Sequence, residues 1–259
     1  MARSRRKTSG TAVWLYGRHA VTAALRNPGR RWRRLVVLPG REEEAAALVA
    51  GARAVKHGDE AAIAVRDHNG FAALLPRHAV HQGLAVEVEP LAAPDLDDVL
   101  RGIASVSGQF LIVVLDQLSD PQNIGAVLRS AAAFGAIAVA VPARGAPPVT
   151  EALAKAASGA VESVPLIRVV NLARALDRLK GAGFWICGLH ESAPRLLAEL
   201  DIEGRIAIVL GSEGSGIRRL VRERCDFLAR LPTRPVQPSL NVSNAAAIAL
   251  YELTRLRSR

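Results

Sequence analysis

Apolar runs alternate with amphipathic stretches along most of the chain, and this alternation predicts strands that are each followed by a helix. Residues 110–115 and 205–210 are almost wholly apolar, which is typical of parallel strands buried on both faces. The pattern predicts an α/β domain over residues 106–259, with a mostly parallel sheet and helices on both faces. Its other strands are expected at 137–141, 166–170, 184–189 and 227–231, and its helices at 126–134, 150–158, 172–180 and 217–224.

The first third of the chain has shorter runs and predicts a separate small α/β domain over residues 13–89. A strand and a helix that stops at Asn27-Pro28 come first, and a helix with three acids in its first turn is expected at 42–56. Residues 90–105 read as a linker that carries a weak helix, and residues 1–12 as a basic flexible arm. The remaining expected elements are strands at 35–38, 61–65 and 83–88 and a short helix at 71–75.

The stretch from residue 231 to residue 251 joins a stiff loop to an alanine-rich helix. Pro232, Pro235 and Pro238 exclude a helix in the first half. Ser239, Asn241 and Ser243 then offer side-chain acceptors where the helix must begin. This pattern fits a plain capped helix and also a ligand pocket. One face of the helix is expected to be buried through Val242, Ala246, Ala249, Leu250 and Leu253.

Composition changes this picture mainly through charge. The formal net charge is +10, and residues 1–90 contribute 15 Lys and Arg against 8 Asp and Glu, a net of +7. A basic first domain favours a polyanionic partner, although an Arg-rich base composition of the genome explains the same excess. No apolar run reaches about 18 residues, so no membrane span is expected. The arm lacks the apolar core of a signal peptide, which favours a cytoplasmic protein. Cys187 and Cys225 have no metal-like spacing, so neither a metal site nor a disulfide is predicted.

Three polar clusters follow predicted strands, at the edge where open α/β sheets place ligands. The first holds Asn123, a candidate helix cap, and Arg129, which could be a surface residue. The second is the glycine loop 211–216 with Glu213. Its order G-x-x-G-x-G does not match a dinucleotide-binding fingerprint, which leaves a nucleotide-dependent oxidoreductase poorly supported. The third is the loop at 231–241.

Taken together in this order, Asn-Ile-Gly-Ala with Arg129, Leu-Gly-Ser-Glu-Gly-Ser-Gly-Ile and Pro-Ser-Leu-Asn-Val-Ser-Asn-Ala resemble the SpoU/TrmH family of RNA ribose 2′-O-methyltransferases. The module that starts at Tyr16-Gly-Arg-His resembles the family's N-terminal RNA-binding domain, which is related to ribosomal protein L30e. Within the family, this arrangement is most similar to enzymes that methylate a guanosine of large-subunit ribosomal RNA. The resemblance covers nearly everything after residue 12.

The resemblance implies a homodimer whose C-terminal domain contains a trefoil knot, a feature that pattern analysis would not suggest. It also implies S-adenosylmethionine as the methyl donor, held largely by backbone groups of the knotted loops. The donor-binding positions that match are Gly211, Leu231, Leu240 and Gly188. The catalytic positions that match are Arg129, Asn123, Glu213, Ser239 and Asn241.

Two points qualify the transfer of these roles. A guanidinium is protonated under almost all conditions, so whether Arg129 acts as a base or as a fixed cation stays open. Family members commonly have Met and Gly where this chain has Thr233 and Pro235. Side-chain roles within residues 233–238 are therefore left unassigned.

Arginines cluster around one indole at Arg30-Arg-Trp-Arg-Arg34, and this cluster is the candidate RNA-binding surface. Trp32 is expected to be a core indole more than a stacking platform. The alternatives to a ribosomal RNA methyltransferase are an RNA 2′-O-methyltransferase that acts on transfer RNA and a catalytically silent ribosome-assembly factor. The arginines of the candidate surface are Arg18, Arg30, Arg31, Arg33 and Arg34, and the arm adds Arg3, Arg5, Arg6 and Lys7.

Overall fold

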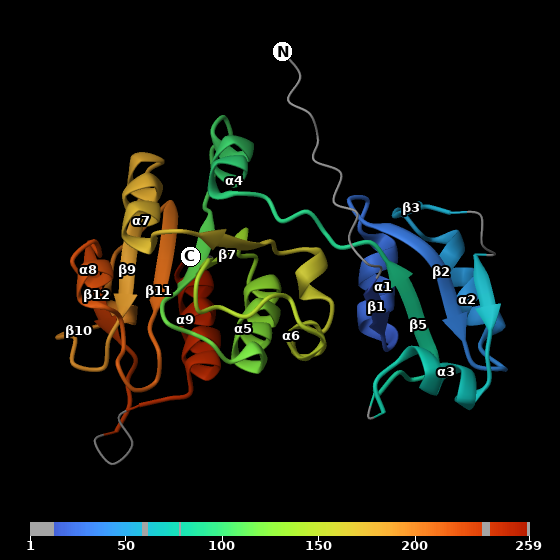
Figure 1. Cartoon of the computed structure of the whole chain (residues 1–259). Helices are drawn as coiled ribbons and strands as arrows, with labels where there is room; N and C mark the ends of the chain where they lie inside the picture. The colour runs from blue at the N-terminus through green and yellow to red at the C-terminus, as the bar shows by residue number, and fades with distance from the viewer. Residues whose placement is uncertain (1–12, 59–61, 78, 235–238, 258–259) are drawn as a thin grey trace. The chain divides into compact units, whose positions relative to one another are not determined.

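The computed structural model describes residues 13–58, 62–77, 79–234 and 239–257. The basic arm and its candidate RNA-binding residues, as well as Pro235 and Pro238, lie outside these ranges. The chain forms two compact units that divide between Ala92 and Ala93 (Figure 1). The region expected to be a linker therefore contributes to the second unit.

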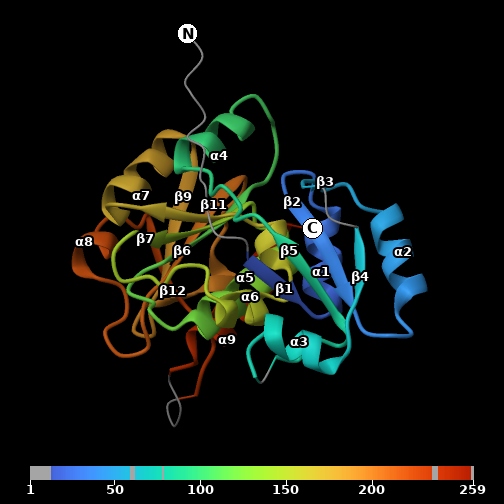
Figure 2. The same cartoon turned by 45° about the vertical axis from the view of Figure 1, so that its right-hand side comes forward.

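Within its described residues, the N-terminal unit is a small mixed sheet with three helices (Figure 2). Its main strand order is β1-β5-β2-β3, and β4 also pairs with β2. Strands β1 and β5 are antiparallel, as are β5 and β2, whereas β3 and β4 run parallel to β2. The elements are β1 (Val13–Tyr16), α1 (Arg18–Arg26), β2 (Arg31–Val37), α2 (Glu42–Ala50), β3 (Val55–Lys56), β4 (Ile63–Val65), α3 (His68–Leu74) and β5 (Leu84–Val88).

The prediction of a helix at residues 42–56 is wrong for the second half of that range. It ends at Ala50, and Gly51 follows as the C-cap. Residues Val55–Lys56 instead form β3, which pairs with β2. Glycine is a weak helix former and commonly follows the last helical turn, so the chain turns there and returns to the sheet.

The described residues of the C-terminal unit form a seven-stranded sheet in the order β10-β12-β9-β11-β6-β7-β8, and neighbouring strands all pair in parallel. The parallel sheet predicted from the apolar runs is confirmed. The strands are β6 (Leu111–Leu115), β7 (Ala138–Pro142), β8 (Leu166–Val169), β9 (Phe184–Leu189), β10 (Arg195–Leu196), β11 (Arg205–Leu210) and β12 (Phe227–Arg230). The helices are α4 (Leu96–Ile103), α5 (Pro121–Ala133), α6 (Glu151–Ala157), α7 (Leu172–Gly181), α8 (Arg219–Arg222) and α9 (Val242–Arg257), with 3₁₀ turns η1 (Ala160–Glu162) and η2 (Leu197–Glu199).

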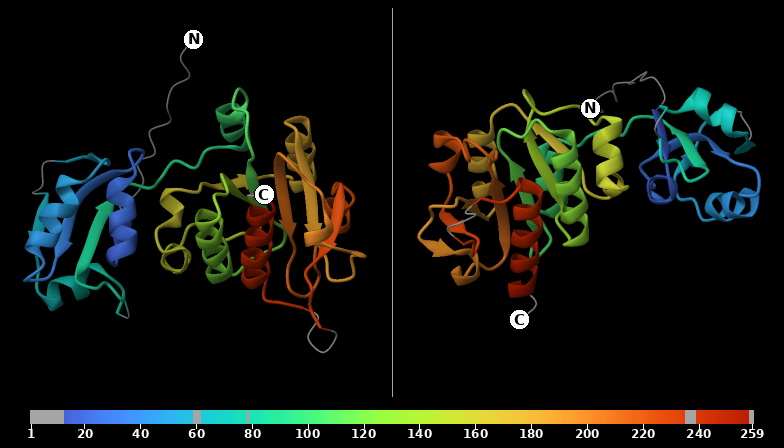
Figure 3. Two further views of the ribbon diagram at one scale, coloured as in Figure 1. Left: turned by 180° about the vertical axis from the view of Figure 1, so that it is seen from behind. Right: turned by 90° about the horizontal axis from the view of Figure 1, so that it is seen from below.

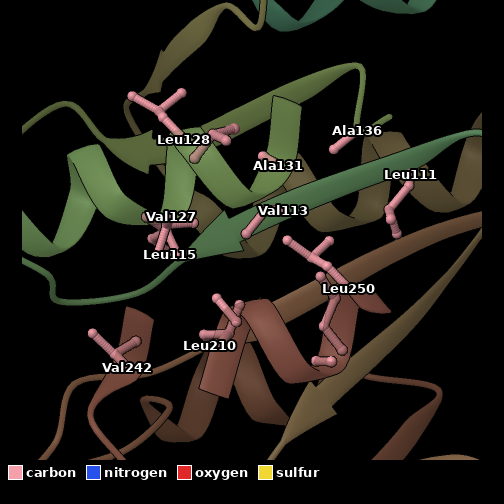
Figure 4. Close-up of a cluster of buried hydrophobic side chains, with 14 of the residues drawn as sticks. Leu111, Val113, Leu115, Val127, Leu128, Ala131, Ala136, Leu210, Val242 and Leu250 are labelled. Carbon is pink, nitrogen blue, oxygen red and sulfur yellow. The ribbon is translucent and has the colours of Figure 1, made fainter. Parts of the chain in front are cut away.

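Helices cover both faces of this sheet, because alternate residues of each strand point to opposite sides. Leu111, Val113 and Leu115 of β6 pack with α5, α6 and α9, whereas Ile112 and Val114 pack with α4, α7 and α8. Figure 3 shows α9 (red) lying beside α5 (green), and Figure 4 shows the side chains that fill this layer. The buried face predicted for α9 is confirmed at all five positions, which are Val242, Ala246, Ala249, Leu250 and Leu253.

Helices α5 and α6 approach each other unusually closely at Gly125. A Cβ atom built on Gly125 would lie 2.5 Å from the carbonyl oxygen of Leu153 and 2.6 Å from the Cβ of Ala156. No side chain larger than hydrogen fits there. This glycine therefore fixes how α5, which carries Asn123 and Arg129, lies against its neighbour.

Candidate active site

Three loops meet at the carboxyl edge of the C-terminal sheet. Strands β12, β9 and β11 are neighbours, so the chain leaves all three at the same edge before entering the segments 231–241, 190–194 and 211–218. A pocket of about 200 Å³ lies among them. The described residues that line it include Leu189, His190, Glu191, Leu210, Gly211, Glu213, Arg230, Leu231, Thr233, Ser239, Leu240, Val242 and Ala245.

The glycine loop after β11 folds back tightly on itself. The backbone N–H of Gly216 donates to the carbonyl of Ser212 at 2.9 Å, and the N–H of Ser212 donates to the carbonyl of Gly216 at 3.2 Å. A Cβ atom on Gly211 would lie 2.0 Å from the carbonyl carbon of Gly216. Gly216 itself has a φ of 64°, in the left-handed region. Gly211 and Gly216 are therefore required by the shape of this loop, whereas nothing lies within 4 Å of a Cβ on Gly214.

A buried carboxylate fixes this loop to the neighbouring strand. Asp116 follows β6, is fully buried, and accepts hydrogen bonds from the backbone N–H and the Nε of Arg218, each at 2.8 Å. The Nη2 of Arg218 lies 2.6 Å from Asp116 Oδ1. Neither residue belongs to the catalytic or donor-binding positions predicted from the sequence. An acid directly after a buried apolar strand is a usable signal, because a buried carboxylate requires a partner.

Gln117 adds a second connection to the same loop. Its Nε2 donates to Ser215 Oγ at 3.1 Å. Its φ is 62°, which is uncommon for a residue other than glycine, asparagine or aspartate. The side chain and the backbone of the β6–α5 turn thus both support the glycine loop.

Asn241 joins the three predicted clusters. Its Nδ2 donates to Glu213 Oε1 at 2.6 Å and to Asn123 Oδ1 at 3.1 Å. The backbone N–H of Val242 also points to Glu213 Oε1, at 3.4 Å. Glu213 thereby accepts hydrogen bonds at the start of α9, where a negative charge is favoured by the helix dipole. Residues that are far apart in the sequence form one polar network beside the pocket.

The prediction that Asn123 precedes its helix, at a capping position, is wrong. Helix α5 begins at Pro121, and Asp120 is its N-cap, accepting from the N–H of Gln122 at 2.9 Å. Proline is favoured at the first helical position and aspartate before it. Asn123 consequently lies within the first turn, where its side chain is available to Asn241.

Arg129 lies on α5 nearly two turns after Asn123 and is exposed. Within the described residues it makes no hydrogen bond or ion pair and does not line the pocket. The structure therefore brings together Asn123, Glu213 and Asn241 but leaves Arg129 outside their network.

The donor-binding positions divide into two groups. Gly211, Leu231 and Leu240 line the pocket, and so does Ser239. Gly188 instead lies inside β9, and the lining on that strand begins at the next residue, Leu189. Its role at the pocket stays a prediction.

The two cysteines lie beneath this region. A Cβ atom on Gly188 would be 2.9 Å from Cys225 Sγ, so the glycine leaves room for that thiol. Burial raises the pKa of Cys187 to about 12, and the nearby Cys225 contributes to the rise. Burial also raises the pKa of Cys225 to about 12, with Asp226 as the next cause. Both side chains are therefore protonated at neutral pH. No group of three or more metal-binding side chains occurs among the described residues.

The arginines of the N-terminal unit occupy different environments. Arg30 is buried and donates through Nη1 to the carbonyl of Glu89 at 2.7 Å, so we correct its assignment from RNA contact to a structural role. Trp32 is also buried, which confirms its core position. Arg18 is exposed and lies 3.0 Å from Glu44.

The remaining arginines face Glu87 of β5 and Glu89, which directly follows that strand. Arg34 Nε lies 2.8 Å from Glu87, and Arg33 lies 4.0 Å from the same carboxylate. A register shift in β2 between Trp32 and Leu35 inserts one extra residue opposite β5. Arg31 pairs with Glu89 at 3.4 Å. Arg31 is exposed, whereas Arg33, Arg34 and Glu87 are half-buried. Ion pairs near the surface are weak and can exchange for other anions.

Comparison with known proteins agrees with this arrangement. Residues 110–251 match the SpoU rRNA Methylase family, and residues 14–94 match the family described as RNA 2′-O ribose methyltransferase substrate binding. The fold and the motifs thus define an RNA methyltransferase with an added substrate-binding domain. The chain belongs to the SpoU rRNA methylase family, as the three motifs predicted.

Two curated relatives match almost end to end. The 23S rRNA (guanosine-2′-O-)-methyltransferase RlmB of Coxiella burnetii is 41% identical over 94% of this chain and 95% of its own length. The protein of the same name from Pseudomonas aeruginosa is 37% identical over 94% and 96%. A putative TrmH family tRNA/rRNA methyltransferase of Bacillus subtilis is 40% identical over 69% of this chain and 72% of its own.

Solved structures share the fold. The SpoU methyltransferase AviRb from Streptomyces viridochromogenes superposes with a TM-score of 0.76 at 23% identity, covering 95% of this chain and 90% of that chain. A second AviRb structure, in complex with the cofactor AdoMet, has a TM-score of 0.74 at 24% identity and covers 94% and 89%. The expected fold class is confirmed, and the knot stays a prediction. Among the described residues, no helix is long and apolar enough to cross a membrane.

Proposed function

We propose that the protein transfers a methyl group from S-adenosylmethionine to the ribose 2′-hydroxyl of a guanosine in large-subunit ribosomal RNA. The observation that carries this proposal is the hydrogen-bonded network of Asn241, Glu213 and Asn123 beside the pocket. The names and near-complete alignment of the RlmB relatives support the substrate.

The pocket suits the nucleoside part of such a donor. Leu189, Leu231 and Leu240 supply apolar walls, and Gly211 lets the glycine loop close tightly on itself at the pocket wall. Backbone groups without side-chain cover can hydrogen-bond a base closely. When bound, S-adenosylmethionine supplies an electrophilic methyl carbon on a sulfonium.

The residues of this chain would act mainly by positioning, which lowers the barrier of an in-line transfer. Asn241 holds Glu213 and Asn123 in place, and Ser239 lies at the pocket wall beside them. Arg129 serves as a fixed cation that orients the hydroxyl and stabilises the oxyanion that develops on it as its proton passes to water. The O–C bond forms as the S–C bond breaks, and S-adenosylhomocysteine is the leaving group. A guanidinium suits this role better than that of a base, because the group stays protonated under almost all conditions in water.

The N-terminal unit is proposed to hold the RNA through Arg18, Arg31, Arg33 and Arg34. The match of residues 14–94 to a substrate-binding family supports this role. Phosphates would replace the weak contacts to Glu44, Glu87 and Glu89. Changing all four arginines to Gln should then reduce the slope of log affinity against log salt concentration. An unchanged slope would refute this surface.

We also propose a homodimer that works in the cytoplasm, where ribosomes are assembled. Ile248 and Tyr251 on α9 are 43% and 55% exposed and lie on one helical face. Exposed apolar side chains grouped in this way commonly mark an interface.

The experiment that tests the function uses donor with a tritiated methyl group and two acceptors, unmodified large-subunit ribosomal RNA and total transfer RNA. We expect label in the ribosomal RNA, at one guanosine whose 3′ phosphodiester becomes resistant to alkali. Label confined to transfer RNA would show that the substrate is transfer RNA and not ribosomal RNA. Donor binding without transfer to either RNA would indicate a catalytically silent RNA-binding factor.

A further inference from the structure

Two side chains of opposite charge line the pocket without pairing. Arg230 is the last residue of β12, and Glu191 lies in the loop after β9. The N–H of His190 donates to the carbonyl of Ala229 at 2.9 Å, so the two charged residues follow directly from paired backbone positions. No ion pair joins them to each other or to another residue in the described part of the chain.

The other polar side chains at the pocket have different tasks. Glu213 accepts from Asn241, and His190 Nδ1 accepts from the N–H of Ser192 at 3.2 Å. Among the described lining residues, Arg230 is the only lysine or arginine. Glu191 is the acid among them that has no hydrogen-bond or ion-pair partner in the described part of the chain. A partly buried arginine without an anion beside it is unusual, because the free energy that it loses on leaving water is not offset by an ion pair.

We infer that Arg230 and Glu191 bind the α-amino acid head group of the methyl donor, a proposal that rests on the proposed function. The carboxylate of the head group would accept from the planar guanidinium of Arg230. The ammonium group would donate to the carboxylate of Glu191. The apolar walls then remain for the nucleoside, so the two ends of the donor are recognised by different parts of the pocket.

The test compares two probes by calorimetry on the full chain. S-Adenosylhomocysteine carries the head group, whereas 5′-methylthioadenosine keeps the nucleoside and sulfur but has a methyl group in place of the amino-acid chain. Arg230→Met should weaken S-adenosylhomocysteine roughly tenfold to a hundredfold, the usual worth of a hydrogen bond to a charged group. Glu191→Gln should weaken it by about tenfold. Neither variant should change the affinity for 5′-methylthioadenosine.

Unchanged binding of 5′-methylthioadenosine also shows that the variants keep their fold. Arg222→Met is the matched control, because Arg222 is exposed on α8 and is not among the lining residues. Equal loss for both probes, or no loss for either, would overturn the inference while leaving the proposed function intact. If the wild-type protein binds neither probe, the donor assignment itself fails.

Discussion

The Nδ2 of Asn241 lies 2.6 Å from Glu213 Oε1, which joins the first residues before α9 to the glycine loop after β11. The same nitrogen also reaches Asn123 on α5. One carboxamide therefore connects three segments beside the pocket, whereas the packing of α9 against α5 and the bonds of Asp116 and Gln117 to the glycine loop hold the surrounding fold together. Its removal should affect chemistry more than folding.

We expect Asn241→Ala to lower the rate of methyl transfer by about a hundredfold, the scale on which positioned polar groups act. Asn241→Asp should be at least as damaging, because it places a second carboxylate against Glu213. Gln122→Ala is the control, since Gln122 is exposed on the same turn of α5 as Asn123. Single-turnover rates with labelled donor measure the effect. Turnover near that of the wild type would contradict the proposed site.

We expect a different effect on substitution of Arg129, because this residue contacts no described residue of the network. Arg129→Ala should abolish most transfer, by at least about a hundredfold, while donor affinity stays unchanged. Arg129→Lys should keep part of the activity, since it keeps the charge but loses the planar fork. Donor titration and transfer rates on the same preparations separate the two effects. Normal turnover of Arg129→Ala would remove this residue from the mechanism.

Gly125 should tolerate no larger side chain. Because a Cβ would lie 2.5 Å from the carbonyl of Leu153, Gly125→Ala must push α6 away from α5, at a cost of about 1–3 kcal/mol. Gly102→Ala in α4 is the matched control, since nothing lies within 4 Å of its Cβ. It should be neutral or stabilising by up to about 1 kcal/mol. Urea unfolding of both variants tests the difference.

Because both thiols are buried, we expect the free energy of unfolding to fall at alkaline pH. Burial raises the pKa of Cys187 and of Cys225 from 9.0 to about 12, so the folded chain keeps both protons where the unfolded chain loses them. The unfolded state then binds fewer protons, and the free energy of unfolding falls as the pH rises from about 9 to about 12. The double variant Cys187→Ala, Cys225→Ala should show a smaller slope over this range. Parallel slopes would mean that the thiols ionise in the folded protein.

We expect the chain to self-associate through the exposed face of α9 that carries Ile248 and Tyr251. Tyr251→Glu combined with Ile248→Glu should convert a dimer to a monomer in light scattering, because two charges per chain would have to be buried. Leu220→Glu is the control, since Leu220 is 55% exposed on α8, which packs against the other sheet face. A wild-type monomer, or a double variant that stays dimeric, would exclude this face.

The sequence predicted those features that depend on local periodicity. The apolar run of β6 implied a strand buried on both sides, and the spacing of Val242 and Leu253 placed both on the buried side of α9. The site was only partly predictable. That Asn123 accepts from Asn241 depends on how β6, β11 and β12 line up in the sheet. Arg30 looks like its cationic neighbours in the sequence, and its burial in the folded unit distinguishes it.

The position of the pocket along the chain has a consequence for synthesis. Its described walls come from residues between Leu189 and Ala245, whereas the substrate-binding match ends at residue 94. A growing chain thus completes the part that matches the substrate-binding family well before the residues that line the pocket are all present. If the N-terminal unit holds the RNA as proposed, a product that stops before α9 would compete for the RNA without modifying it, and premature termination should inhibit methylation by the intact protein.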